Sequence, residues 1–517
     1  MSLDAVGLEV MGHAFASIAE EMGLVLIHSS VSPNIRERRD CSAALFDPEG
    51  EMIAQAAHIP VHLGAMHESV AAVRALGPAP GDVFILNDPY TGGSHLPDIT
   101  LVGAIDLAGA VGGYSVVRAH HSDVGGVQAG SMPAGTRELF AEGVIVPPLR
   151  LTSEVERFLL ANVRTPEIRR ADLAAQRAAV ERGGEGIRAL AARYGAAAMQ
   201  AAARDLLDYA ERRTREALRR WTVAGVTVSD FLEGDGVDDT DLAIQVRVDI
   251  RDGTFAADFT GTAPAAVGNV NCPLAVARSA VLFVVRTLLP DDVPTNGGVQ
   301  RVVSVTAPAG CLVNARFPSA VAAGNVETSQ RIADTVFLAL ARGGVSVPAQ
   351  GQGTMNNVTF GGLGVRGSGL ADAWTYYETI GGGQGASRGA PGPSGVHVGM
   401  SNTRNTPVEV LEMECPLRVR TYALRRESGG DGRWRGGDGV VREFEALAPT
   451  TAAILAERRR HAPHGVAGGR DAQRGETLLN GAPLAPKVST PLAPGDVLRI
   501  ATPGGGGWGD PEHGDER

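Results

Sequence analysis

Two short apolar segments between residues 81 and 126 each run into a loop that is rich in histidine and aspartate. The first, 83–86, ends at Asn-Asp-Pro, where proline prevents a helix from continuing; a Gly-Gly pair and Ser-His-Leu-Pro-Asp follow. The second, 114–117, runs into Arg-Ala-His-His-Ser-Asp. We therefore expect two neighbouring strands whose ends gather six polar side chains: Asp88, His95, Asp98, His120, His121 and Asp123.

Imidazole and carboxylate groups together are the ligands expected for zinc, manganese or iron. Both groups lie on glycine-bent loops, which usually carry function while the scaffold supplies stability. The alternative is structural, since a His-x-x-Asp motif is often only a hydrogen-bonded pair in a loop. Asp40, just before an earlier predicted strand, is likewise either a further metal or substrate carboxylate or a loop acid paired with the nearby Arg36, Arg38 and Arg39.

Composition limits the classes of function. A chain of 517 residues with 44% hydrophobic and 20% charged residues can form several packed domains. Its net charge of −11 argues against a nucleic-acid or anionic-membrane partner. Four scattered cysteines indicate reduced thiols. The acidic N-terminal segment is typical of an amphipathic helix rather than a signal peptide, so we expect a cytoplasmic protein.

We expect an α+β fold, a multi-sheet mixed α/β enzyme with a helical insert and a β-rich C-terminal part. The helical insert should be interrupted at Pro166 and at Gly183-Gly184, giving three or four helices. The 67 glycines are about twice the usual share, and those at 381–385 and in the C-terminal part are expected to form tight turns between strands. The expected regions are 1–150 with the metal site, 151–225 helical, 226–415 αβ and glycine-rich, and 416–517 β-rich.

Several longer stretches together resemble one known family. In chain order they include NDPYTGGSHLPDITLV, AHHSDVGG, NVRTPEIRRADLAAQ, YYETIGGGQGA, GGDGRWRGGDGVVRE and TPGGGGWGDP. An ordered series of this kind is far more specific than a single short motif. On these motifs the chain resembles the hydantoinase B/oxoprolinase family nearly from end to end. That family includes the B subunit of ATP-dependent N-methylhydantoinases, one half of 5-oxoprolinase, and the large subunits of acetone and acetophenone carboxylases.

The resemblance implies one divalent or transition metal ion, held by the His-x-x-Asp pair, a later histidine and, in some members, an earlier aspartate. Because neighbouring residues of a strand point to opposite faces, only one of the two adjacent histidines should reach the ion. We favour His121, which leaves His120 in the core or behind the ligands, and Asp123 is a reserve ligand. The ligands implied for this chain are therefore His95, Asp98, one of His120 and His121, and Asp40.

The resemblance also implies a partner, an actin-like ATPase subunit of the hydantoinase A type that uses ATP to phosphorylate the carbonyl oxygen of the substrate. The sequence agrees with this division of labour, because its glycine-rich stretch at 381–385 lacks the Lys-Ser/Thr pair of a Walker A motif. We expect a hetero-oligomer whose substrate is a small cyclic amide, a lactam or a hydantoin.

A ring amide is stabilised by resonance, so its hydrolysis needs a better leaving group or a better nucleophile. Phosphorylation by the partner would supply the first, and a metal ion in this chain would supply the second by lowering the pKa of water. We expect Asp88 or Asp123 to orient the histidine ligands, and Glu378 to form part of the wall of the substrate pocket.

Two alternatives stay open. In a ketone carboxylase, the same metal site would stabilise an enolate and direct it onto carboxyphosphate or CO₂. In a scaffold subunit without catalytic function, the chain would only dock and regulate the ATPase.

Overall fold

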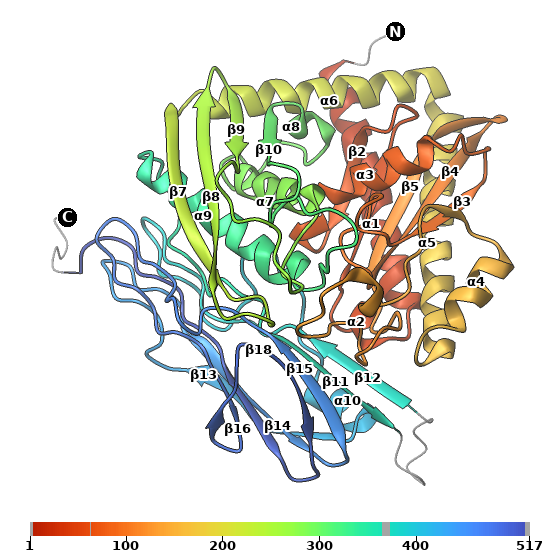
Figure 1. Cartoon of the computed structure of the whole chain (residues 1–517). Helices are drawn as coiled ribbons and strands as arrows, with labels where there is room; N and C mark the ends of the chain where they lie inside the picture. The colour runs from red at the N-terminus through yellow and green to blue at the C-terminus, as the bar shows by residue number, and fades with distance from the viewer. Residues whose placement is uncertain (1–3, 63, 364–372, 512–517) are drawn as a thin grey trace.

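The computed structural model describes residues 4–62, 64–363 and 373–511, which fold into four sheets with helices between and around them (Figure 1). The expected α+β class is confirmed. In the described part of the chain, the short helices outside the main layers are α2 (Pro33–Arg36), α8 (Gly297–Gln300) and α10 (Val408–Glu414). Single helical turns are η1 (Pro60–His62), η2 (Leu139–Ala141) and η3 (Gly324–Thr328).

The first sheet is antiparallel and is covered on both faces, so its central strands are almost entirely buried. Helices α1 (Ala5–Ser29) and α5 (Pro166–Tyr194) pack on one face, and α3 (Ala65–Arg74) packs on the other. Its strand order is β2-β1-β5-β4-β3-β6. The strands are β1 (Cys41–Phe46), β2 (Met52–Ala57), β3 (Val83–Leu86), β4 (Asp98–Leu107), β5 (Ala110–His120) and β6 (Leu149–Arg150).

Helix α1 would by its length and mean hydropathy of 1.4 alone be able to cross a bilayer. In this structure its apolar stripe is instead buried against α5 and the first sheet. The stripe follows the helical period expected from the sequence, through Met11, Phe15, Ile18, Met22 and Leu26.

The helical segment consists of α4 (Ser153–Leu160), α5 and α6 (Ala196–Leu218). Pro166 begins α5, a position at which a missing backbone N–H removes no hydrogen bond of the helix. The expected break at Gly183-Gly184 is wrong, because α5 runs straight through both residues. A Cβ atom on Gly183 would lie 2.6 Å from the Met22 sulfur and 2.7 Å from the Ser115 Cβ. This glycine therefore lets α5 pack closely on α1 and the sheet, instead of ending a helix.

The second sheet has the order β10-β9-β8-β7, with α7 (Leu274–Thr287) and α9 (Ser329–Arg342) in its core. A hairpin turns over Asp252-Gly253, and both residues have positive φ, as a tight two-residue turn requires. The strands are β7 (Val223–Glu233), β8 (Asp241–Arg251), β9 (Thr254–Asp258) and β10 (Val303–Thr306).

The third and fourth sheets share one apolar core and form the sandwich at the bottom of Figure 1. This β-rich part begins near residue 357, before the boundary expected at 416. The third sheet contains β11 (Asn357–Leu363), β12 (Ala373–Glu378), β15 (Thr450–Leu455) and β18 (Lys487–Leu492). The fourth contains β13 (Leu417–Arg425), β14 (Gly439–Ala446), β16 (Glu476–Leu479), β17 (Ala482–Pro483) and β19 (Val497–Ala501).

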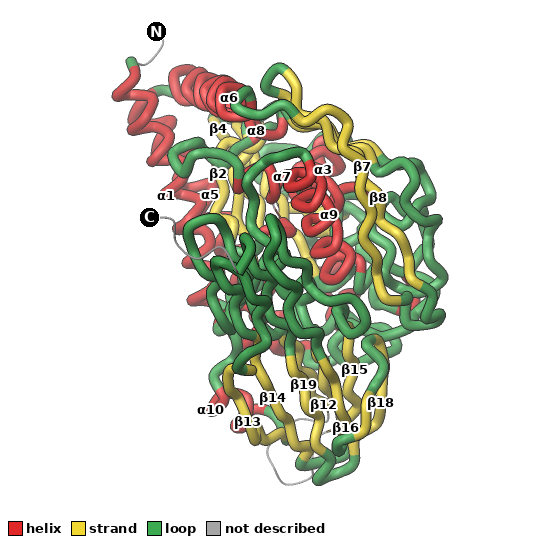
Figure 2. The backbone as a smooth tube through the Cα atoms, turned by 90° about the vertical axis from the view of Figure 1, so that its left-hand side faces the viewer, coloured by secondary structure: helices red, strands yellow, loops and turns green. Residues whose placement is uncertain are grey.

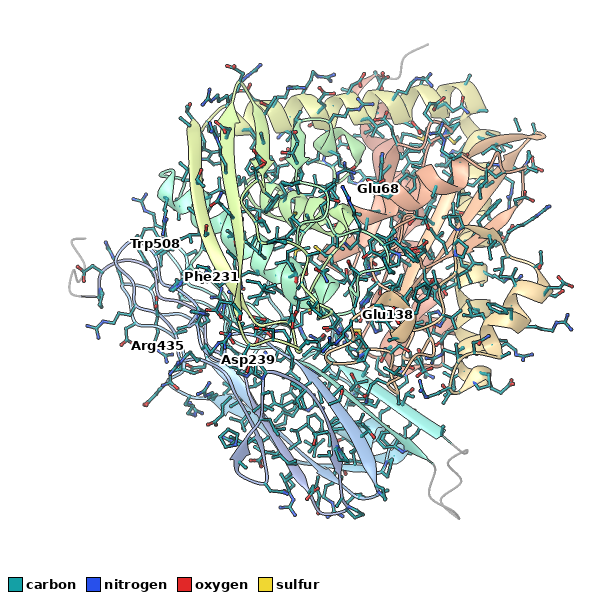
Figure 3. All side chains as sticks on the ribbon, viewed as in Figure 1. Glu68, Glu138, Phe231, Asp239, Arg435 and Trp508 are labelled. Atoms are coloured by element: carbon teal, nitrogen blue, oxygen red, sulfur yellow. The ribbon has the colours of Figure 1, made fainter. Side chains whose placement is uncertain are left out.

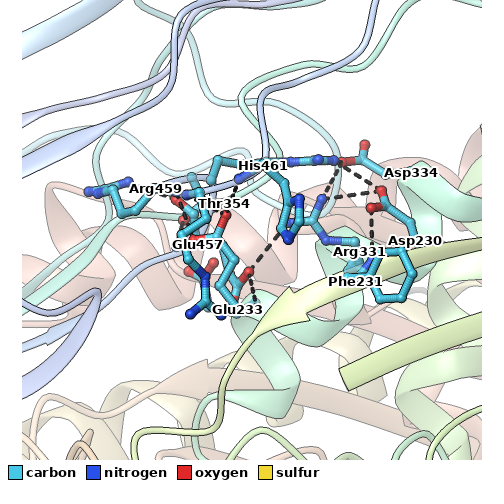
Figure 4. Close-up of polar contacts among 12 residues, drawn as sticks. Asp230, Phe231, Glu233, Arg331, Asp334, Thr354, Glu457, Arg459 and His461 are labelled. Atoms are coloured by element: carbon cyan, nitrogen blue, oxygen red, sulfur yellow. Dashed lines mark hydrogen bonds and ion pairs between the residues drawn. The ribbon is translucent and has the colours of Figure 1, made fainter. Parts of the chain in front are cut away.

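A buried network of charges joins β7, α9 and the segment after β15 (Figure 4). Arg331 on α9 contacts Asp230 of β7 at 3.3 Å and Glu457 at 3.4 Å. Arg458 contacts Asp334 of α9 at 2.6 Å. Because a buried charge without its partner is costly, these contacts hold the second sheet, α9 and the sandwich in one arrangement.

Most of the glycine-rich segments do not form the expected turns. Segments around 381–386, 428–437, 464–470 and 503–509 lie side by side as the extended loops at the centre of Figure 2, joined by backbone hydrogen bonds. A Cβ atom on Gly436 would lie 1.8 Å from the backbone oxygen of Gly505. Neighbouring backbones touch here and no side chain fits between them, so these positions require glycine.

We expect Gly436→Ala to lower the midpoint of thermal unfolding by about 5 °C or more, because backbone must move to admit the methyl group. The measurement is differential scanning calorimetry of the purified chain. Gly481→Asn is the matched control, since Gly481 has a positive φ that asparagine tolerates and nothing within 4 Å of its Cβ position. Equal midpoints for the two variants would contradict the close-packing role.

Candidate metal centre

The start of β4 and the end of β5 bring the two predicted polar clusters together. The strands are antiparallel neighbours, and Asp98 pairs directly with His120. The prediction that 83–86 and 114–117 would be the neighbouring strands is wrong, because β4 lies between them. The clusters still meet, since the first residue of one antiparallel strand lies beside the last residue of the next.

Three buried side chains converge at this point. His95 Nε2 lies 3.1 Å from Asp98 Oδ1, and His120 Nδ1 lies 3.2 Å from both of these atoms. Ligand atoms about 2.0–2.2 Å from one ion lie about 3–3.6 Å from one another, so this spacing fits a single metal ion. His120 Nε2 is also buried with no hydrogen-bond partner. The donor set and the geometry therefore fit a transition-metal ion.

Further polar groups surround the second oxygen of Asp98. Ser94 Oγ donates to Oδ2 at 2.5 Å, Asn325 Nδ2 donates at 3.2 Å, and His62 Nε2 lies 3.5 Å away. The sequence analysis did not single out Asn325 or His62 as part of this site. Asn325 belongs to the π-helical turn η3 that precedes α9. Such turns are frequent at functional sites, but no local pattern connects this residue to a loop more than two hundred positions earlier.

These residues line a cavity of about 20 Å³, which has room for about one ion or water molecule. Asp40 lines it too, as the sequence predicted, although its carboxylate also lies 3.7 Å from Arg38. The backbone oxygen of Asp40 accepts a hydrogen bond from the His120 N–H and so fixes the end of β5. Both interpretations of Asp40, ligand and paired loop acid, therefore have a structural basis.

His121 does not reach this cavity, contrary to the expectation that it would be the ligand. Its Nε2 lies 2.9 Å from Gln176 Oε1 on α5, on the other face of the strand. Burial and the nearby Arg169 charge lower the pKa of His121 to about 4, so the ring is neutral. Strand alternation thus separates the two histidines as expected, and it is His120 that joins His95 and Asp98.

Electrostatics within the cluster favour an ionised carboxylate. Burial disfavours the Asp98 charge, but the His95 charge and the hydrogen bonds to Asp98 outweigh it and hold the Asp98 pKa well below its usual value. Burial also disfavours charge on His95, but Asp98 reverses this and raises the pKa of His95. For His120 burial prevails and lowers the pKa, leaving a neutral ring that can donate a lone pair to a metal.

Neither of the aspartates expected to orient the histidines contacts one. Asp88 Oδ1 accepts from the Tyr90 N–H. Asp123 accepts from the backbone N–H groups of Gly125 and Gly130 and pairs with Arg164 at 3.0 Å. Both carboxylates therefore shape their own loops, because short loops offer them unpaired N–H groups nearby.

His95 is oriented instead by a backbone carbonyl. Its Nδ1 lies 3.2 Å from the oxygen of Ala322. Buried Glu142 accepts from the N–H groups of Val321 and Ala322 at 2.9–3.1 Å and so holds this segment in place. Burial raises the pKa of Glu142 to about 7.

Glu378 lies away from the cavity that the sequence assigned to it. It forms a fully buried ion pair with Arg442 at 2.7 Å inside the sandwich. Its neighbours Tyr377 and Thr379 line the cavity instead, because successive residues of an extended chain point to opposite faces. The Tyr377 ring stacks on His120, with centroids 4.5 Å apart, and so fixes the orientation of the imidazole.

A profile of the hydantoinase B/oxoprolinase family matches residues 4–511. The chain belongs to this family. It is 37% identical to 5-oxoprolinase 1 of Arabidopsis thaliana over 98% of its own length, but spans only 42% of that protein. It is 29% identical to the putative B subunit of a D-/L-hydantoinase from a Pseudomonas species, over 98% of this chain and 90% of that one.

Two solved structures share the fold. An ATP-dependent caprolactamase from Pseudomonas jessenii superposes with a TM-score of 0.91 at 26% identity, covering all of this chain and 93% of the other. Acetone carboxylase gives a TM-score of 0.88 at 18% identity, covering 98% and 75% of the two chains, a likeness of fold alone. The family expected from the sequence is thus confirmed.

We expect His120→Ala to abolish near-stoichiometric metal binding, because it removes one of three converging ligands. His121→Ala should retain the metal, since that ring contacts α5 instead. The measurement is elemental analysis of both folded variants and the wild-type chain. Metal lost from the His121 variant and kept by the His120 variant would reverse this assignment.

Replacing Glu142 should weaken metal binding without touching a ligand. In Glu142→Gln an amide N–H₂ would oppose the backbone donors of 321–322, so we expect about a 10-fold loss of metal affinity in a chelator-competition titration. Glu138→Gln is the control, because Glu138 (labelled in Figure 3) is exposed in the same loop. Equal affinities for both variants would mean that the segment holds His95 without Glu142.

Proposed function

We propose that this chain is the hydrolytic subunit of an ATP-dependent enzyme that opens a small cyclic amide. The observation that carries the proposal is the buried cluster of His95, Asp98 and His120, whose ligand atoms lie 3.1–3.2 Å apart. The likeness to proteins named caprolactamase, 5-oxoprolinase and hydantoinase supports a cyclic amide as the substrate. Zinc, manganese and iron all suit a ligand set of mixed nitrogen and oxygen.

The chemistry requires both activation of the ring and activation of water. An amide carbonyl resists attack because its nitrogen donates electron density, and phosphorylation of the carbonyl oxygen would remove that resistance. A bound metal ion would activate water by lowering its pKa toward neutrality. Within the chain, Asp98 would supply the negative charge and neutral His120 a lone pair, and His95 would supply a second lone pair once binding of the ion displaces its proton.

The side chains around the cluster control access and proton transfer. The Asp40 carboxylate lines the cavity and is placed to accept a proton from water inside it. Tyr377 and Asn325 close the cavity from the sandwich and α9 sides. Since about 20 Å³ does not admit a lactam ring, substrate must enter by displacing part of this lining. Closure afterwards would exclude bulk water from the activated ring.

An ATPase-type partner subunit completes the proposal. The chain spans only 42% of Arabidopsis 5-oxoprolinase 1, and the hydantoinase relative is named as one subunit of its enzyme. We infer that the phosphorylation step takes place on a second chain of the hydantoinase A type and that the two chains form a hetero-oligomer. We further propose a cytoplasmic location and no nucleic-acid or membrane partner, which suits the net charge of −11.

We expect Asp98→Asn to lower ATP-dependent ring opening by about 100-fold or more, because it removes the charge at the centre of the cluster. The assay combines the chain with its ATPase subunit and follows hydrolysis of 5-oxoproline, hydantoin and caprolactam. Asp106→Asn is the matched control, an exposed aspartate on the same strand. ATP hydrolysis by the partner should continue in both variants.

Normal turnover by the Asp98 variant would overturn the proposal. Incorporation of labelled bicarbonate carbon into product, with no ring opening, would instead assign the site to a carboxylase. Full activity of a metal-free complex would leave the chain as a scaffold.

A further inference from the structure

A second polar hollow lies in the C-terminal part of the molecule and shares no lining residue with the metal centre. It is open to solvent, has a volume of about 580 Å³, and is formed by the end of β13, the segment after β15 and the start of β16. This size is within the range of small-molecule sites. Three arginines, Arg425, Arg459 and Arg474, lie in its wall.

None of these three guanidinium groups has a carboxylate within 4 Å among the described residues. This is unusual in a chain with 58 acidic and 47 basic residues, in which many arginines form ion pairs. Arg425 donates to the backbone oxygens of Arg474 and Thr502, and Arg474 donates to that of Arg460. The lining therefore carries three positive charges against one exposed acid, Glu476.

Arg459 is held rigidly at the base of this group. Its Nη1 donates to the Glu457 backbone oxygen at 2.7 Å, and its Nη2 donates to Asn356 Oδ1 at 2.9 Å and Thr477 Oγ1 at 3.0 Å. A Cβ atom on Gly475 would lie 2.4 Å from Nη1, so the glycine makes room for the guanidinium. Figure 4 shows the side chain extending away from the carboxylates of the buried network.

The Nε of Arg459 is buried and has no hydrogen-bond partner. Burial lowers the pKa of Arg459 to about 10, which keeps the group charged at neutral pH. The charge of Arg459 therefore adds to the positive potential at the wall of the hollow, where it attracts an anion.

We propose that this hollow binds a phosphate group, either as free phosphate or as part of a small phosphate ester. A phosphate dianion offers two charges and several oxygens to guanidinium forks, which bind such groups in paired hydrogen bonds. A carboxylate offers one charge and two oxygens, so it satisfies fewer of these donors. The inference is independent of the proposed function, because the two sites share no lining residue.

The test is isothermal titration of the full chain with inorganic phosphate, glycerol 3-phosphate and acetate, in phosphate-free buffer at constant ionic strength. We expect saturable binding of the phosphates, with acetate at least 10-fold weaker. Arg474→Ala should weaken phosphate binding at least 10-fold, and the exposed position of Arg474 leaves folding intact. Arg212→Ala, which removes an exposed arginine on α6, is the control and should bind like the wild type.

Absence of saturable phosphate binding would overturn the proposal, and so would equal binding by the Arg474 variant and the control. Arg425→Ala, the second variant, should weaken phosphate binding as well. Tighter binding of the ester than of inorganic phosphate would identify a phosphorylated molecule as the ligand, and the reverse order would identify free phosphate.

Discussion

The pairing of Asp98 with His120 across β4 and β5 is the contact on which the candidate metal centre depends. Two central strands buried on both faces hold this pair, so neither side chain can move without disturbing a packed sheet. The His95 loop, the backbone of Asp40 and the stacked ring of Tyr377 then complete the cluster from three other segments. A metal site needs ligands held in this way, since small displacements lose the coordination geometry.

The buried charge network carries this organisation to the rest of the molecule (Figure 4). Arg331 and Asp334 tie α9 to β7 and to the segment after β15. The turn that begins this helix presents Asn325 to Asp98. Removing one member of this network would leave its partner's charge buried alone, which destabilises the fold. The sandwich, which supplies Tyr377 through β12, is therefore fixed relative to α9 and the second sheet by electrostatics as well as by packing.

At two glycines the local sequence pattern predicts the wrong structure. The pattern predicts a helix break at Gly183 and a turn at Gly436, because those are the commonest roles of glycine in a sequence. In the structure both positions are points of close contact, with a sulfur atom in one case and a backbone oxygen in the other. Nothing in the neighbouring residues distinguishes a glycine that bends the chain from one that admits another segment. The distinction depends on which distant segment packs there.

The sequence by itself determined the α+β class, the family, and the His-x-x-Asp and His-His motifs, because period, composition and ordered motifs are local properties. It also showed that His120 and His121 must point to opposite faces of a strand. Only the tertiary structure decided which of them joins Asp98, since that depends on which face α5 covers. The same holds for Asn325 beside Asp98 and for Glu378 inside the sandwich. Contacts between residues hundreds of positions apart are set by packing, and no local pattern records them.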